Sequence, residues 1–420
     1  MENPGRARIA ALLAALWVVL APAHSFADDQ EEPHHPGWVK RRVHSFLGDE
    51  DAGDGRGLHL GPFAPRIEIV SSGAGPAPML HFWAPDIGGT PLDIHVSASY
   101  SIFNYQYYDM QVGLVPHQGK RLPRVDRGTS GFFPLADLEK TAAVPGFNIY
   151  VSARYRDYPR EDYYGIGSAS LRSDHTGYRL QDGLYQGVVR FRVAHVSLMG
   201  RVGLLKTTIL PGTDSAWPDT EISNDEATAP GLLRSPDFLH VSAGAWLELR
   251  DQPGNPHRGV SLGVSYSRFD DRHGNAFQFN RAIVDAREYI PLGSNRHVVA
   301  LRQVASLDRP DAGSRVPFYM QSTLGGSTFL RGYNSFRFRD DKLLALVGEY
   351  RFEVVPKVEL ALLYETAEVF PTMGKFDLGN LRRSYGAGIR LKSPKKVQLR
   401  LDVLHSSEST RVHVKLDPSF

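Results

Sequence analysis

The side chains that most often perform chemistry in proteins are unevenly supplied in this chain of 420 residues. It contains no cysteine, which excludes disulfide bonds, thiolate zinc sites and cysteine nucleophiles. Sixteen histidines and many serines could supply a hydrolase, but no G-x-S-x-G motif places a serine on a sharp turn. Gly165-Ile166-Gly167 is not followed by a phosphate-binding lysine, so it is not a nucleotide-binding loop. These patterns favour a protein that is not an enzyme.

Candidate metal ligands are concentrated near the N-terminus. His34-His35 and the acidic residues between Asp49 and Asp54 are of a suitable type, but their spacing fits no metal-binding loop. A solvated segment has the same composition. Lys and Arg number 48 against 46 Asp and Glu, so no strong basic field predicts nucleic-acid binding. We therefore expect no metal, no cofactor and no nucleic acid.

The first residues have the pattern of a secretory signal peptide. Arg6 and Arg8 precede an apolar run over residues 9–23, and Ser25-Phe26-Ala27 is a small-residue cleavage site. The alternative is an N-terminal anchor that is not cleaved, but the run is short for a membrane-spanning helix. Residues 1–27 are therefore predicted to be a signal peptide. Residues 28–65, rich in Asp, Glu, His and Gly, are predicted to be a flexible periplasmic leader.

The remainder of the chain, residues 66–420, alternates between apolar and polar positions. Period two predicts β-strands with one apolar face, and the other face here is small or charged. A soluble sandwich also alternates, but strands of about ten residues bordered by aromatic residues are typical of a transmembrane barrel. Helical periodicity is scarce, and Pro134 to Lys140 is compatible with one turn in a loop. The alternating segments include residues 92–100, 147–155, 239–250, 260–267, 385–391 and 397–403.

The C-terminus resembles the last strand of a bacterial outer-membrane barrel. Val412, Val414 and Leu416 share one face, and the chain ends at Phe420 in phase with that stripe. A terminal aromatic residue of this kind resembles the signal read by the outer-membrane assembly machinery. Pro418 occupies a position in the stripe, and proline cannot donate to a strand ladder. We therefore expect a weak lateral seam between the last and the first strand.

Six or more ordered motifs after residue 250 carry a family resemblance. The chain resembles the BamA/TamA-type outer-membrane barrel superfamily, also called the bacterial surface antigen family. The resemblance is firmest over residues 250–420 and is weaker from about residue 160. The motifs are Asp251 with Asn255-Pro256 and Gly259, then Tyr289–Leu292, Phe318-Tyr319, Leu324–Ser327, Leu330–Tyr333, Arg337–Asp340, Glu349–Phe352, Tyr385–Leu391 and Leu399–Val403.

The resemblance implies an all-β fold, a transmembrane antiparallel barrel of about sixteen strands with a plug loop folded into its lumen. Arg331, Gly332 and Tyr333 match the tip of that loop, and Glu349 and Glu365 match its partners on the lumen wall. The family more often has Asp where this chain has Glu365, and a longer Glu can still reach. A buried arginine needs a carboxylate, because its planar donors bind carboxylates bidentately. Gly332 is expected to permit a sharp turn, and Tyr333 to add a packed ring with a polar end.

The resemblance also implies a function. Members of the superfamily insert or translocate proteins, and they normally carry periplasmic POTRA domains before the barrel. The segment from Asp28 to Arg66 is shorter than one such domain, so this chain is expected to be a short member without them. We therefore expect a barrel in the bacterial outer membrane that contacts its lipid. It would transport or assemble a protein or lipid-linked client with a separate periplasmic partner. The alternatives are a diffusion pore or surface adhesin and, less favoured, an outer-membrane hydrolase.

Overall fold

The computed structural model describes residues 62–68, 70–71, 74–75, 77–117, 134–141, 144–214, 216–392 and 397–415. They belong to one compact unit, His44–Phe420. The expected signal peptide, most of the expected leader, and Pro418 and Phe420 lie outside the described residues. The first strand begins at Phe63, close to the expected start of the barrel at residue 66.

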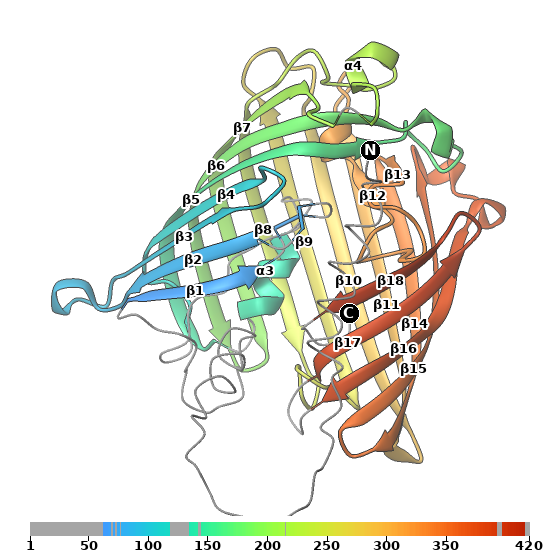
Figure 1. Cartoon of the computed structure of the whole chain (residues 1–420). Helices are drawn as coiled ribbons and strands as arrows, with labels where there is room; N and C mark the ends of the chain where they lie inside the picture. Colours follow the sequence, from blue (N-terminus) through green and yellow to red (C-terminus); the bar gives the residue numbers. More distant parts are fainter. Residues whose placement is uncertain are drawn as a thin grey trace, which may run out of the picture. The chain divides into compact units, whose positions relative to one another are not determined.

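The fold is a 16-stranded antiparallel sheet in which each strand pairs with the next along the chain (Figure 1), so the expectation of about sixteen strands is confirmed. The strands are β1 (Phe63–Glu68), β2 (Ala77–Ala84), β3 (Asp93–Tyr100), β4 (Gln106–Gly113), β5 (Gly146–Tyr163), β6 (Thr176–Val193), β7 (Val196–Pro211), β8 (Phe238–Glu248), β9 (Gly259–Asp271), β10 (Phe279–Leu292), β11 (Ser294–Pro310), β14 (Lys342–Val355), β15 (Val358–Phe370), β16 (Arg382–Lys392), β17 (Val397–Ser406) and β18 (Thr410–Lys415).

The two faces of the sheet have opposite chemistry, and their orientation separates a membrane barrel from a soluble sandwich. In β9, Val260, Leu262, Val264 and Tyr266 are exposed, whereas the alternating Ser261, Ser265 and Ser267 are buried. A soluble sandwich would bury the apolar set. Here the apolar stripe faces outward and the small polar residues face the interior, which is the arrangement of a transmembrane barrel. We call the buried, concave face the inner wall.

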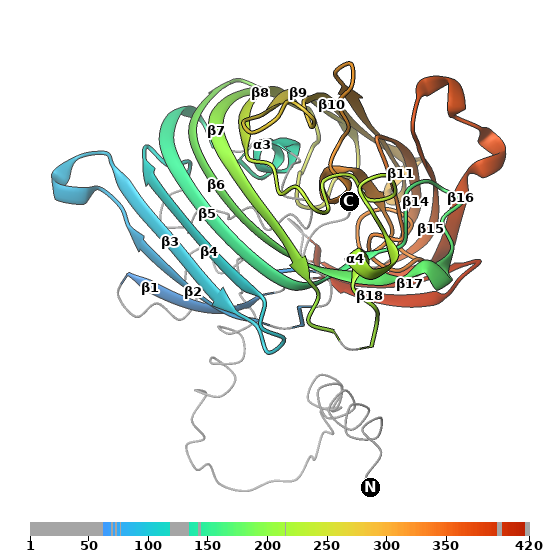
Figure 2. The ribbon, with the colours of Figure 1, turned by 90° about the horizontal axis from the view of Figure 1, so that it is seen from above.

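Two segments between strands lie against the inner wall. The plug loop, residues 311–341, connects β11 to β14 and contains a separate two-stranded sheet of β12 (Ser322–Leu324) and β13 (Phe338–Asp340). The second segment is α3 (Pro134–Thr141), in the connection between β4 and β5; Figure 2 shows it on the concave side of the sheet. Connections of an up-and-down sheet alternate between its two ends, so α3 and the plug loop enter from opposite ends.

The remaining helices are short and lie in the connections between strands. Among the described residues, no helix is long and apolar enough to cross a membrane. The short helices are α4 (Thr220–Ser223), η1 (Ile87–Gly89), η2 (Arg172–Asp174), η3 (Phe318–Met320), η4 (Met373–Lys375) and η5 (Leu378–Asn380).

An aromatic cluster anchors the first part of the plug loop. The Phe318 ring lies 4.9 Å from the rings of Tyr163 and Tyr178, in edge-to-face contacts. The hydroxyl of its neighbour Tyr319 lies 3.0 Å from Thr207 Oγ1. The Phe318-Tyr319 motif therefore packs the loop onto β5, β6 and β7, and this fixes where the rest of the loop enters the lumen.

Candidate functional site

The two arms of the plug loop pair with each other as β12 and β13, and the tip of the loop lies beyond this pair. Leu324 pairs with Phe338, and the tip lies between them. Gly325 and Gly326 follow β12 with φ angles of 101° and 87°, a region that favours glycine. A Cβ on Gly325 would lie 2.0 Å from the carbonyl oxygen of Asn334, across the tip. The Leu-Gly-Gly-Ser motif therefore makes the tight turn that brings Arg331 to the inner wall.

Arg331 contacts three carboxylates on the inner wall. Its Nε donates to Glu365 Oε1 on β15 at 2.5 Å, and its backbone N–H donates to Glu365 Oε2 at 2.6 Å. Its Nη1 donates to Asp402 Oδ2 on β17 at 2.7 Å, and Nη2 lies 3.5 Å from Glu349 Oε1 on β14. Burial would lower the pKa of Arg331, but the three carboxylates raise it above its ordinary value. The guanidinium therefore stays charged and ties the loop to three strands.

A second arginine, Arg390 on β16, completes the network from the wall itself. It donates to Glu349 Oε2 at 3.0 Å and to Asp402 Oδ1 at 3.1 Å. Glu365 has no contact of this kind with Arg390, and its Oε2 accepts instead from Ser384 Oγ at 2.6 Å. Arg331 is therefore the cation on which Glu365 depends, whereas Glu349 and Asp402 are shared between the loop and the wall.

Gly332 and Tyr333 hold the tip against β17. A Cβ on Gly332 would lie 2.9 Å from the carbonyl carbon of His405 and 2.9 Å from Ser406 Cβ. The Gly332 carbonyl accepts from Ser406 Oγ at 2.8 Å and from Ser409 Oγ at 2.7 Å. Tyr333 is buried, with its hydroxyl 3.0 Å from Ser407 Oγ. Gly332 is thus required for close backbone approach, and its φ angle is not in the left-handed region that a sharp turn would use.

The structure brings Arg331, Glu349 and Glu365 together and adds residues that were not singled out from the sequence. Asp402 and Arg390 both lie within motifs of the family resemblance, at buried positions of the alternating pattern. The signal that could have identified them is a charged residue on the small-residue face of a strand, which needs a partner inside the barrel. Which partner it has depends on the strand register, and this cannot be derived from spacing along the chain.

Gly388 makes room for the Asp402 carboxylate, and its substitution gives a first test of the network. The two residues are directly opposite in β16 and β17, and a Cβ on Gly388 would lie 2.0 Å from Asp402 Oδ1. We expect Gly388→Ala to push Asp402 from Arg331 and to lower the free energy of unfolding by about 1–3 kcal/mol. Urea unfolding in lipid vesicles measures this value. Gly200→Ala in β7, where a Cβ meets nothing within 4 Å, is the control. Equal stability of the two variants would contradict the assignment.

Among the described residues, no group of three or more His, Asp or Glu is arranged to hold a metal ion. His34, His35 and the acidic residues 49–54 lie outside these residues. One cluster does resemble a hydrolase site: Ser97 Oγ lies 3.3 Å from His95 Nε2 and 3.0 Å from His81 Nδ1. However, His95 Nδ1 is 4.0 Å from Asp109, beyond hydrogen-bond distance, and Ser97 is fully buried. A serine nucleophile needs an oriented base and access to substrate, so this cluster gives the hydrolase alternative no support.

Residues 146–403, which contain the plug loop together with Glu349, Glu365, Arg390 and Asp402, match the Omp85 superfamily domain. They make up more than half of the 420 residues. The chain belongs to the Omp85 superfamily. The resemblance to BamA/TamA-type barrels is therefore confirmed, and the protein is an Omp85 β-barrel of the outer membrane.

The solved structure of a BamA barrel agrees in fold. BamA from Haemophilus ducreyi lacking POTRA domains 1–3 superposes with a TM-score of 0.56 and 14% identity, over 81% of this chain and 66% of that chain. This Omp85 chain thus spans slightly less than two thirds of the BamA chain. CdiB from Acinetobacter baumannii gives a TM-score of 0.44 at 11% identity, over 82% and 54% of the two chains. CdiB from Escherichia coli gives 0.45 at 12% identity, over 89% and 73%. No curated protein matches the sequence.

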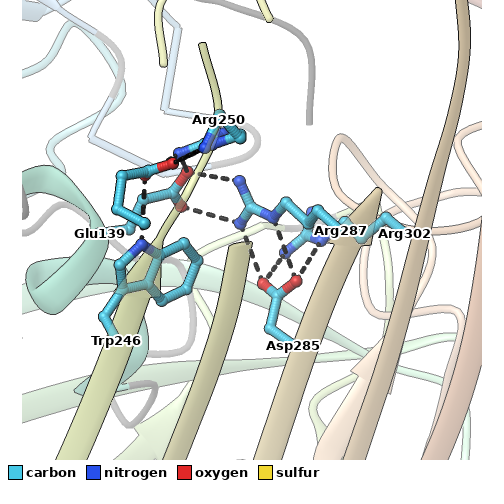
Figure 3. Close-up of polar contacts among 7 residues, drawn as sticks. Glu139, Trp246, Arg250, Asp285, Arg287 and Arg302 are labelled. Atoms are coloured by element: carbon cyan, nitrogen blue, oxygen red, sulfur yellow. Dashed lines mark hydrogen bonds and ion pairs between the residues drawn. The ribbon is translucent and has the colours of Figure 1, made fainter. Parts of the chain in front are cut away.

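This Omp85 barrel has a second charged cluster on its inner wall, around α3 (Figure 3). Arg287 of β10 donates to both carboxylate oxygens of Glu139 on α3, with Nη2 2.8 Å from Oε2. Arg250, just after β8, lies 3.7 Å from Glu139 Oε1. The Arg287 guanidinium also lies 5.3 Å from the centre of the Trp246 ring. The sequence pattern was compatible with one helical turn here; the structure has an eight-residue helix whose charge partners are on distant strands.

Proposed function

We propose that this Omp85 barrel inserts or translocates a protein or lipid-linked client at the outer membrane, together with a separate periplasmic partner. This is the class of activity that the family resemblance implies. We further propose that residues 1–27 are removed as a signal peptide on export. In this proposal Arg331, Gly332 and Tyr333 are positioning residues: they hold the plug loop in the lumen, with Glu349, Glu365 and Asp402 as its attachment points.

The observation that carries the proposal is the contact between the plug loop and the last strand. Lys415 Nζ of β18 donates to the carbonyl of Ser327 at 2.8 Å, and Arg411 Nη1 donates to Asn334 Oδ1 at 2.5 Å. His413 Nε2 lies 2.7 Å from the carbonyl oxygen of Arg331. Within the described residues, β18 pairs with β17 alone. The plug loop therefore adds to the support that β17 gives the last strand, as expected where a client enters through a lateral seam.

The interior of the barrel argues against a permanently open diffusion pore. The plug loop enters the lumen from one end and α3 from the other, and each is fixed to the inner wall by an ion pair, buried for Arg331 with Glu365 and partly exposed for Arg287 with Glu139. An open pore has a water-filled channel.

Site-specific photo-crosslinking in cells tests the proposed activity. A photo-reactive amino acid at Val412, whose side chain points outward from β18, should capture a client or partner protein in addition to lipid. The matched control is the same substitution at Tyr266, which points outward from β9 in the middle of the sheet. We expect protein adducts at Val412 and lipid alone at Tyr266. Lipid alone at both positions, or the same protein adducts at both, would overturn the proposal of a client at the seam.

A further inference from the structure

The helix α3 packs against a complementary surface of the inner wall, and this surface is separate from the plug-loop network. We propose that α3 is a removable plug: it leaves this position and returns to it, and its departure opens the lumen at the end opposite to the plug loop. The proposal goes beyond the transport activity, because it concerns passage through the barrel whatever the client is. Three observations support the proposal. The helix packs on an apolar contact surface, three arginines of the wall bind it, and each of these arginines also has an acceptor on the wall itself.

The apolar contact surface of the wall is complementary in shape to α3. Leu135 and Leu138 are three residues apart, so they lie on one face of the helix, and both are buried. At two of the contact points the wall has glycine, which leaves room for a leucine side chain. A Cβ on Gly244 would lie 2.8 Å from Leu138 Cδ1, and one on Gly263 would lie 3.2 Å from Leu135 Cδ2. We call this surface the α3 seat; its buried apolar side chains are Val188, Met199, Trp246 and Ile283.

Three arginines hold the polar side of α3. Arg287 and Arg250 face Glu139, as Figure 3 shows, so the carboxylate of Glu139 lies between two cations. Arg190 on β6 donates through Nη2 to the carbonyl of Thr141 at 2.5 Å and to that of Val144 at 2.7 Å. The last carbonyls of a helix have no partner inside the helix, so Arg190 caps its C-terminal end. The helix is thus bound at its apolar face, its charge and its end.

Each of these arginines has a second acceptor on the wall that stays when α3 leaves. Arg287 donates to Asp285 at 3.1 and 2.9 Å, and Arg250 donates to Glu248 at 2.7 and 2.5 Å. Arg190 donates to Asn148 Oδ1 at 2.9 Å. A buried charge left without a partner is costly; on release of α3, Arg287 and Arg250 keep a carboxylate and Arg190 keeps the amide oxygen of Asn148. The plug loop differs, because Arg331 is the only arginine among the described residues that pairs with Glu365, and release of the loop would remove it.

The helix itself is suited to two states. An isolated helix shorter than about 12–15 residues is marginal in water, and α3 has eight residues. Its helical form therefore depends on the seat, and leaving the seat is coupled to unfolding of the helix. Glu139 is 27% exposed in the docked state, so it does not pass from a fully buried to a hydrated state on release. We therefore expect two states of this segment, a docked helix and an undocked, unfolded chain. An undocked helix is not expected to be stable.

Conductance of the purified full chain in planar bilayers tests the proposal, because it requires no knowledge of the client. The chain has no cysteine, so Leu138→Cys with Gly244→Cys introduces one disulfide that locks α3 to its seat. We expect the oxidised protein to stay closed and the reduced protein to show the transient openings of the unmodified barrel. Ser242→Cys with Ser267→Cys, which are opposite each other in β8 and β9, is the control for locking the wall alone. Equal conductance of the oxidised and reduced Leu138/Gly244 pair would overturn the proposal.

A second variant fills the seat instead of locking it. Gly263→Val places methyl groups against Trp246 and Leu135, and should raise the time-averaged conductance about tenfold by disfavouring the docked state. Replacement of residues 134–141 by a Gly/Ser linker of the same length should raise it at least as much. A heat-modifiability gel shows that each variant has folded. If the linker variant folds and conducts no more than the unmodified barrel, α3 does not close the lumen.

Discussion

Replacing Arg331 by methionine should lower the free energy of unfolding of the barrel by about 3–5 kcal/mol. The substitution keeps much of the side-chain volume and removes the charge that the inner wall is built to receive. Glu349 and Asp402 keep Arg390, but Glu365 is left in a buried position with two neutral donors, Ser384 Oγ and the backbone N–H of residue 331. Urea unfolding of the protein in lipid vesicles measures the loss, and a heat-modifiability gel gives the same ranking.

A matched arginine distinguishes this effect from the loss of any ion pair. Arg268 also binds two carboxylates, Asp270 at 2.7 Å and Asp311 at 2.7 Å, but all three side chains are partly exposed. Arg268→Met should therefore cost at most about 1 kcal/mol. The double variant Arg331→Met/Glu365→Gln should be more stable than Arg331→Met, because it removes the unpaired carboxylate. If Arg331→Met and Arg268→Met are equally stable, the network does not hold the plug loop.

Larger side chains at position 332 should detach the same loop, because they would clash with β17. Gly332→Val places its Cβ 2.9 Å from the backbone carbonyl carbon of His405 and 2.9 Å from Ser406 Cβ on β17, so the tip must move away from the wall. We expect a loss of about 1–3 kcal/mol, with Gly332→Ala intermediate. The displaced tip should also become accessible to added protease, which limited proteolysis of intact vesicles measures.

The control for this series is Gly374 in η4, a loop glycine around which a Cβ meets nothing within 4 Å. Gly374→Val should change the free energy of unfolding by no more than about 0.5 kcal/mol. Its resistance to protease should equal that of the unmodified barrel. Protease resistance that stays unchanged in Gly332→Val would mean that the loop tolerates the added side chain. The close approach to β17 would then not be what positions Arg331.

The sequence alone determined the features of this barrel that repeat locally. Alternation with period two predicted the strands, because successive side chains on a strand point to opposite faces. Arg331, Glu349 and Glu365 were identified through the family resemblance, which rests on motifs in a fixed order along the chain. The predictions for residues 1–27, Pro418 and Phe420 stay predictions, since these residues lie outside the described structure.

Only the tertiary structure decided which side chains meet. Asp402 reaches Arg331 from 71 positions along the chain, and Glu139 meets Arg287 from 148 positions away. Such contacts depend on strand register and on the path of loops, neither of which leaves a periodic signal. The α3 seat is the clearest example: two leucines and a glutamate in a loop acquire their role only when Gly244, Gly263 and Arg287 come together on adjacent strands. The physical reason is that period two is set by the backbone of one strand, whereas an ion pair or a fitted surface is set by several.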